Sequence, residues 1–186
     1  MAEKKISPPF TDKVITALKA GDRVLISGTI YTARDAAHLR MMQAIKAKSP
    51  LPFDLKGQLI YYTGPTPAPK GKVIGSAGPT TSSRMDTYTP ELLSMGLKGT
   101  IGKGTRGEKV KSAIKKYKAV YFVATGGAGA LLSKTIKSAK IIAYPELGPE
   151  AIYKLQVIDF PAIVANDCYG KDFFEKGIKK YRRRNK

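Results

Sequence analysis

The chain has 186 residues, and its 33 Lys and Arg against 14 Asp and Glu give a net charge of +19. This length suits one domain with a sizeable core, and 42% apolar and 25% charged residues are ordinary for a globular protein. No apolar run reaches the ~20 residues of a membrane-spanning helix, and no apolar leader follows Met1, so we expect a cytoplasmic protein. With one cysteine, Cys168, and one histidine, His38, the sequence excludes an internal disulfide and argues against a self-contained zinc or iron–sulfur site.

The strong positive charge predicts an anionic partner, and nucleic acid is the first candidate. However, the lysines are scattered, and only residues 176–186, with seven positive charges, form a basic block. Such a block is typical of a solvated chain end, and no zinc-finger, helix-turn-helix or RNA-binding aromatic pattern accompanies it. The distribution disfavours nucleic acid and leaves open a small polyanionic substrate or an acidic protein surface.

The predicted elements of the first half alternate between helices and strands, from apolar spacing and Gly or Pro stops. We expect helices at residues 12–20, 33–48 and 88–95, and strands at 23–31, 59–63 and 72–74.

The second half alternates more regularly and carries two glycine-rich segments, 98–107 and 126–129, which we interpret as loops. Helices are expected at residues 108–117, 130–136 and 173–184, and strands at 119–125, 139–143, 152–157 and 162–165. This pattern predicts one α/β domain with a mixed sheet over residues 1–186, with 1–10 and 176–186 peripheral.

The most informative segment is residues 75–86, which read GSAGPTTSSRMD. Glycines and a proline give a tight loop, and Thr80 and Thr81 lead a run of hydroxyl side chains that ends in Arg84 and Asp86. Backbone N–H groups, hydroxyls and a guanidinium together are suited to gripping a carboxylate. An ordinary polar turn is the alternative for the glycine and proline part alone.

A second group of polar residues starts the helix that follows the strand at 23–31. Arg34 and His38 are four residues apart and share a helix face, and Asp35 lies in the first turn. Arg34 is a candidate anion clamp or a surface ion-pair partner, and His38 a structural or functional histidine.

Two further signals are weaker. Lys103 lies between glycines, but the spacing of a phosphate-binding Walker loop is not met, so it is either a cation presented into a cleft or part of a flexible basic turn. Glycines 126, 127 and 129 lack the full dinucleotide-binding fingerprint, and Cys168 is more typical of a packed small side chain than of a reactive thiol.

Several motifs occur in an order that resembles a known family. They are residues 33–38 (ARDAAH), 62–65 (YTGP), 75–86, 102–104 (GKG), 159–162 (DFPA) and 167–174. From about Thr11 to Phe174 the chain resembles the β subunit of iron–sulfur (class I) fumarate hydratase and L-tartrate dehydratase, which corresponds to the C-terminal domain of the single-chain enzymes.

The resemblance implies a swivelling β/β/α domain that closes over a partner α subunit. It also implies a 4Fe–4S cluster held by that subunit's cysteines, with none held by this chain, and reversible addition of water to a dicarboxylate double bond. We therefore expect a subunit of a heteromeric hydro-lyase that is inactive alone. Fumarate is the expected substrate, L-tartrate is the alternative, and a basic nucleic-acid-binding protein is the alternative from another class.

The resemblance assigns roles to individual residues. Thr80 corresponds to the proposed base beside a substrate carboxylate, and three cations, Arg34, Arg84 and Lys103, correspond to carboxylate-binding residues. A dianion in a closed site requires several fixed cations, in agreement with this assignment. We expect supporting roles for four further residues: His38, Asp35, Asp86 and Thr81. The two aspartates are expected to hold the arginines in place.

Overall fold

The computed structural model describes residues 3–182, and the outer part of the basic tail, residues 183–186, lies outside the described residues. Seven strands form one mixed sheet in the order β1-β2-β3-β4-β5-β7-β6, with an additional pairing of β2 and β7. The strands are β1 (Lys4–Ile6), β2 (Arg23–Thr32), β3 (Leu59–Tyr61), β4 (Gly99–Gly102), β5 (Val120–Val123), β6 (Ile136–Ala143) and β7 (Ile152–Asn166). The mixed α/β fold predicted from the sequence is confirmed.

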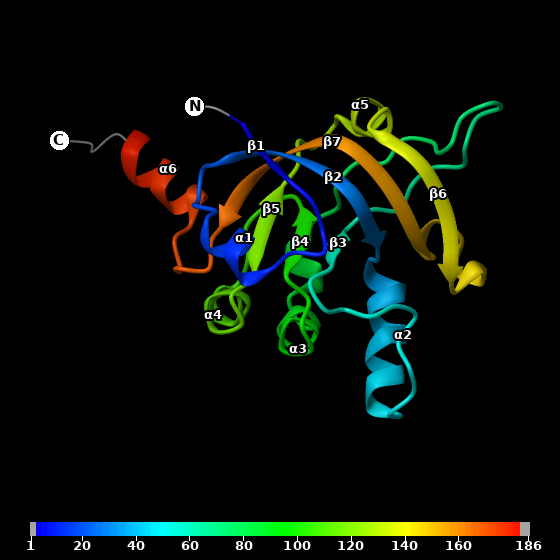
Figure 1. The fold of residues 1–186 in the computed structure, drawn as a ribbon, viewed down its shortest axis with the longest axis horizontal. Helices are drawn as coiled ribbons and strands as arrows, with labels where there is room; N and C mark the ends of the chain where they lie inside the picture. Colours follow the sequence, from blue (N-terminus) through cyan, green and yellow to red (C-terminus); the bar gives the residue numbers. More distant parts are fainter. Residues whose placement is uncertain (1–2, 183–186) are drawn as a thin grey trace.

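Strands β2 to β5 are parallel neighbours, and β7 runs antiparallel to both β5 and β2. These pairings close the sheet on itself into a barrel-like arrangement, while β1 extends it at β2 and β6 extends it at β7. In Figure 1 the long strands β6 and β7 arch over the short parallel strands.

The helical elements are α1 (Asp12–Thr16), α2 (Asp35–Lys46), α3 (Thr89–Ser94), α4 (Glu108–Lys116), α5 (Gly129–Ser133) and α6 (Phe173–Tyr181), with the 3₁₀ helices η1 (Ser82–Met85) and η2 (Pro145–Glu150). Helices α2, α3 and α4 lie on one side of the strands (Figure 1). The loop between β3 and η1 extends away from these helices, on the side of α5 and β6.

Side chains on the parallel strands alternate between two hydrophobic cores. Leu59 and Tyr61 of β3 belong to the inner core, to which α1 and α5 add Ile15 and Leu132. Ile60, between them, belongs to the outer core, which includes buried side chains of α2, α3 and α4. This period of two is expected for strands that are covered on both faces.

Three predicted elements were wrong. Residues 72–74 do not form a strand: they lie in an extended loop where Val73 is 48% exposed. The predicted loop 98–107 contains the buried strand β4. A Cβ at Gly99 would lie 2.6 Å from Leu59 Cδ1, so these glycines mark close packing in a central strand rather than a turn.

The third correction concerns the C-terminal strands, because residues 152–157 and 162–165 belong to one strand, β7. The polar break is a bulge: Asp159 adopts a left-handed φ of 50°, and its N–H donates to Ser27 Oγ at 2.9 Å. Pairing resumes beyond it, with Phe160 opposite Ile26. A bulge therefore bends the strand without ending it.

Candidate active site

The predicted site residues gather where the parallel strands end. Arg34 follows β2, Tyr62 follows β3 and Lys103 follows β4. Because neighbouring parallel strands have their carboxyl ends at the same edge, these positions share one edge of the sheet. The loop with residues 75–81 crosses the same edge.

Thr80 is held between the ends of β3 and β4. Its N–H and its Oγ1 both donate to the Tyr62 carbonyl, at 2.8 and 3.1 Å. Its own carbonyl accepts from the Lys103 N–H at 3.1 Å, and the Ser82 N–H donates to the Lys103 carbonyl at 2.9 Å. Thr81 forms a parallel bridge with Lys103. The loop thus acts as a short extra strand beside residue 103.

Arg34 and Arg84 share one acidic partner. Asp35 Oδ2 lies 3.2 Å from Arg34 Nε and 3.3 Å from Arg84 Nη2. Asp35 therefore contacts both arginines, which is the geometry that its expected supporting role requires. Arg34 has a second acidic partner that is not apparent from the sequence. Oε1 of Glu150, in η2, lies 3.3 Å from Arg34 Nε, and its Oε2 accepts from the Ala36 N–H.

Arg34 also packs against the chain that follows Tyr62. A Cβ at Gly64 would lie 3.0 Å from Arg34 Nη1 and 3.1 Å from its Cδ, so the guanidinium packs closely against this glycine. Tyr62, the anchor of Thr80, lies two residues before Gly64, a separation of roughly 7 Å in extended chain. The hydroxyl of Thr80 and the guanidinium of Arg34 therefore both lie beside the short segment from Tyr62 to Gly64.

His38 is fully buried beneath this edge. Its Nδ1 lies 3.0 Å from the Arg34 carbonyl, and because a carbonyl only accepts, Nδ1 carries the proton. Its Nε2 has no hydrogen-bond partner among the described residues, and the ring packs against Tyr62 and Tyr88. Burial lowers the pKa of His38 to about 4, so the ring is neutral and supports Arg34 through its backbone.

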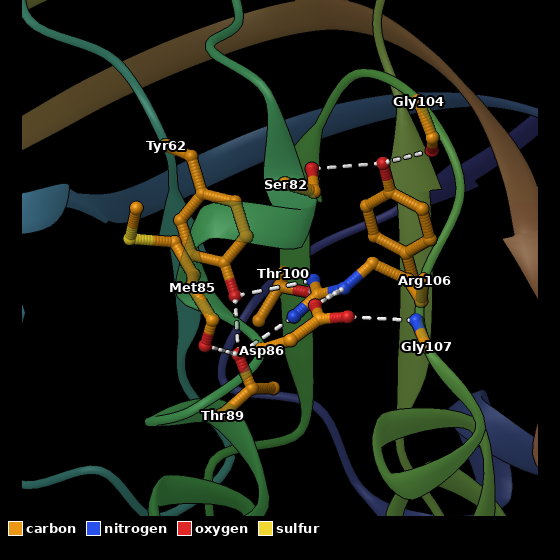
Figure 2. A network of polar contacts seen from close by, with 10 residues as sticks. Tyr62, Ser82, Met85, Asp86, Thr89, Thr100, Gly104, Arg106 and Gly107 are labelled. Atoms are coloured by element: carbon orange, nitrogen blue, oxygen red, sulfur yellow. Dashed lines mark hydrogen bonds and ion pairs between the residues drawn. The ribbon is translucent and has the colours of Figure 1, made fainter.

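Asp86 does not hold Arg34 or Arg84, contrary to expectation. Its Oδ1 lies 2.7 Å from Nε of Arg106, and its Oδ2 accepts from the Gly107 N–H at 2.7 Å (Figure 2). The sequence-based interpretation missed Arg106. This arginine lies in a glycine-rich polar segment 20 residues after Asp86, and no sequence pattern links the two positions.

The cationic side chains are reachable from solvent. Lys103 is exposed, and the side chain of Arg84 is 46% exposed. A cavity of about 430 Å³ opens beside Lys103, lined mostly by apolar side chains such as Leu132 and Phe174. Arg34 is more enclosed, with 23% of its side chain exposed, and Thr80 is half-buried. The edge therefore presents two exposed cations beside a partly enclosed guanidinium and hydroxyl, an arrangement that can bind a carboxylate-bearing ligand.

The donor set of this chain does not fit an iron–sulfur cluster. Within residues 3–182, no three His, Cys, Asp or Glu side chains gather in a way that could hold a metal ion. Cys168 is buried beside Ile15, far along the chain from Thr80, and burial raises the pKa of its thiol. Over the same residues, no helix is long and apolar enough to cross a membrane.

Comparison with known proteins gives a consistent result. The family model described as Fumarase C-terminus matches residues 3–177. Fumarate hydratase 2 of Leishmania major is 41% identical over 90% of this chain, which covers 30% of that protein. The aerobic class I fumarate hydratase of Escherichia coli is 41% identical over 83% of the chain, which covers 28% of it.

A third relative has nearly the length of this chain. A protein named as the L(+)-tartrate dehydratase subunit beta of Methanocaldococcus jannaschii is 38% identical over 92% of the chain, which covers 91% of that protein. The chain therefore spans less than a third of the two fumarate hydratases but nearly all of the subunit.

Proposed function

The chain belongs to the fumarase C-terminal domain family, and we propose that it is the β subunit of a heteromeric iron–sulfur hydro-lyase that hydrates fumarate to malate in the cytoplasm. The observation that supports this proposal is that Thr80, Arg34, Arg84 and Lys103 all lie at the carboxyl edge of the parallel strands. A dicarboxylate needs at least two cationic contacts, and this edge offers three.

Thr80 is the residue of this chain that handles the proton. In the direction from malate to fumarate, the C–H bond next to a carboxylate breaks and its proton moves to the alkoxide of Thr80 Oγ1, while the hydroxyl group on the neighbouring carbon leaves as hydroxide. The proton that Thr80 released on forming its alkoxide converts this hydroxide to water. A threonine hydroxyl must lose its own proton before it can accept one, and the positive charges of Arg84 and Lys103 favour its alkoxide form. The same charges stabilise the negative charge that develops on the substrate carboxylate.

The partner would be an α subunit that holds a 4Fe–4S cluster, since this chain lacks the thiolates for one. The exposed positions of Arg84 and Lys103 support such a partner, because a closed site excludes water and strengthens electrostatic contacts. We propose that this domain swivels to close over the α subunit and that neither subunit is active alone.

L-tartrate is the second candidate substrate. The separate-subunit relative from Methanocaldococcus jannaschii, whose name refers to tartrate, supports it. Both substrates are dicarboxylates and would use the same three cations, so the residues of this chain favour neither.

The first test is an anaerobic pull-down with this chain as bait, followed by a visible absorption spectrum and assays with fumarate and L-tartrate. We expect a brown, oxygen-sensitive complex that produces malate from fumarate. A complex that acts only on L-tartrate would show that L-tartrate, and not fumarate, is the substrate. A colourless eluate with no cysteine-bearing partner would overturn the proposal.

The second test is the pair Thr80→Ala and Thr80→Ser in the assembled complex. The Thr80 N–H still binds the Tyr62 carbonyl in both variants, so the loop should keep its position. We expect Thr80→Ala to lose at least a hundredfold in kcat, whereas Thr80→Ser retains measurable turnover because it keeps a hydroxyl. Near-normal turnover of Thr80→Ala would remove Thr80 from the mechanism.

A further inference from the structure

A buried guanidinium lies directly beneath the loop that carries Thr80 and Arg84. The side chain of Arg106 has no exposed surface, an unusual state for a charged group. The guanidinium lies between the rings of Tyr62 and Tyr121. Its central carbon, Cζ, is 5.4 Å from the centroid of the Tyr62 ring and 5.0 Å from that of Tyr121. Burial opposes its charge, but Tyr62 and Asp86 beside it hold the pKa of Arg106 above its ordinary value.

The three nitrogen atoms of the Arg106 guanidinium donate to four residues (Figure 2). Nε binds Asp86, just after η1, and Nη2 donates to Thr89 Oγ1 of α3 at 2.7 Å. Nη1 donates to the Tyr62 hydroxyl at 3.3 Å and to Thr100 Oγ1 of β4 at 3.4 Å. One planar group thus ties the end of the loop to the end of β3 and to the first half of β4.

The directions of the surrounding hydrogen bonds follow from one carbonyl. Thr89 Oγ1 lies 2.8 Å from the Met85 carbonyl, which can only accept, so Thr89 donates there. Thr89 Oγ1 then accepts from Arg106 and from the Tyr62 hydroxyl at 3.1 Å. Among the described residues, none of the buried side-chain nitrogen and oxygen atoms of this network lacks a hydrogen-bond partner, which makes a single arrangement of the loop favourable.

We propose that Arg106 is the positioning residue that fixes Thr80 and Arg84 relative to each other. Tyr62 links the network to Thr80: its hydroxyl accepts from Arg106, and its carbonyl holds the Thr80 hydroxyl and N–H. Asp86 links it to Arg84, which lies two residues earlier, in η1. This inference rests on the proposed function for its catalytic meaning, but the positioning itself is a property of this chain.

The test compares Arg106→Lys with Lys98→Met. Lysine keeps the charge but cannot reach Asp86, Thr89, Tyr62 and Thr100 at the same time. Lys98, at the other end of β4, also has a mostly buried side chain and pairs with Asp12, so its loss destabilises the fold without touching the network. Amide hydrogen exchange is measured on the full chain, and kcat and KM on the assembled complex.

We expect Arg106→Lys to speed exchange of the Thr80, Ser82 and Lys103 amides at least tenfold relative to those of β2, and to lower kcat at least tenfold per folded complex. Lys98→Met should lower the melting temperature and leave both quantities unchanged. Unchanged exchange at Thr80 in folded Arg106→Lys would overturn the proposal.

If Arg106→Lys does not fold, Tyr62→Phe is used, because it removes one hydroxyl from the same network. It should speed exchange of the Thr80, Ser82 and Lys103 amides by a smaller factor, and unchanged exchange at these amides would overturn the proposal. If the wild-type complex hydrates no dicarboxylate, the proposed function fails, and the exchange measurements still decide whether Arg106 fixes the loop.

Discussion

Arg84 differs from the other two cations in how it is held. Its carboxylate contact is a single 3.3 Å ion pair with Asp35, and nearly half of its side chain is exposed. The remaining N–H donors of such an arginine can bind a ligand without leaving a buried charge unpaired. This suits a residue that binds the substrate better than one with a structural role.

The substitution Arg84→Lys tests this role. Lysine keeps the charge but cannot bind a carboxylate through two parallel N–H groups, so we expect a loss of transition-state stabilisation of about 2 kcal/mol, or about thirtyfold in kcat/KM. The measurement is steady-state kinetics of the complex, with Arg40→Lys, an exposed arginine paired with Glu146, as the control. Unchanged kcat and KM in Arg84→Lys would contradict this substrate-binding role.

His38 makes the stability of the fold depend on pH. Its folded-state pKa of about 4 lies below the ordinary 6.5, so the unfolded chain binds the proton more tightly. The contribution of His38 to the free energy of unfolding is complete above pH 6.5 and is lost as the pH falls toward 4. Arg106 adds to this effect, while Asp35 and the bond to the Arg34 carbonyl oppose it.

We expect His38→Phe to remove this dependence. The Arg34 carbonyl keeps the helical bond from the residue 38 N–H at 2.8 Å, so the variant leaves no unpaired acceptor. Between pH 7 and pH 4 the wild type should lose up to about 3 kcal/mol more of its unfolding free energy than the variant does. Urea unfolding at four pH values measures this, and equal pH slopes would show that His38 is not buried in the neutral form.

The sequence names most of these candidate residues and predicts the contacts of Asp35 with two arginines, but it does not reveal Arg106 or Glu150 as their partners. Thr80, Arg84 and Asp86 are named by one local motif, and four-residue helical spacing brings Arg34 and His38 together. The Asp86–Arg106 and Arg34–Glu150 contacts join residues 20 and 116 positions apart, and only the closed sheet brings them into contact. A single sequence holds no signal for such pairs when both partners occur in polar loops.

Strand β4 positions the site through its glycines. A Cβ at Gly102 would lie 2.0 Å from Ser82 Oγ, 2.9 Å from Tyr62 Cδ2 and 3.2 Å from the Thr80 carbonyl. The loop with Thr80 can lie against the end of β4 only because this strand ends without a side chain.

We therefore expect Gly102→Ala to move the loop. The variant should lose about 1–3 kcal/mol of stability through overpacking and at least tenfold in kcat, because the methyl group displaces Ser82 and Tyr62. Gly177→Ala is the matched control, since a Cβ in that helix meets nothing within 4 Å and should be neutral or slightly stabilising. Urea unfolding and turnover of the complex measure both effects, and a Gly102→Ala complex with normal kcat would contradict this account.

The elements that could be predicted are those with uninterrupted periodicity and clear ends. Helices α2 and α4 and strand β2 lie within two residues of their expected bounds. Strand β4 was missed and β7 was divided because glycine, aspartate and proline usually mark turns. Here tertiary packing overrides that preference: glycines allow close contact in a buried strand, and a bulge accommodates Asp159.

The net charge of +19 is a property of the whole molecule and not of the candidate site alone. A surplus of 19 positive charges exceeds what the proposed dicarboxylate site with three cations would require. Lysines spread over the surface produce a long-range field, and such a field accelerates association with an acidic partner more than it strengthens the final complex.

We predict that the α subunit presents an acidic surface and that the association rate constant falls at least tenfold between 20 and 300 mM NaCl, where the screening length shortens from roughly 20 Å to about 6 Å. Stopped-flow mixing of the separated subunits measures this rate, and random-sequence RNA serves as the competing anion. An association rate constant that does not change with salt would show that the positive charge of this chain does not accelerate subunit assembly. Tight binding of the RNA at 150 mM NaCl that neither fumarate nor the α subunit reverses would instead assign the charge to nucleic acid.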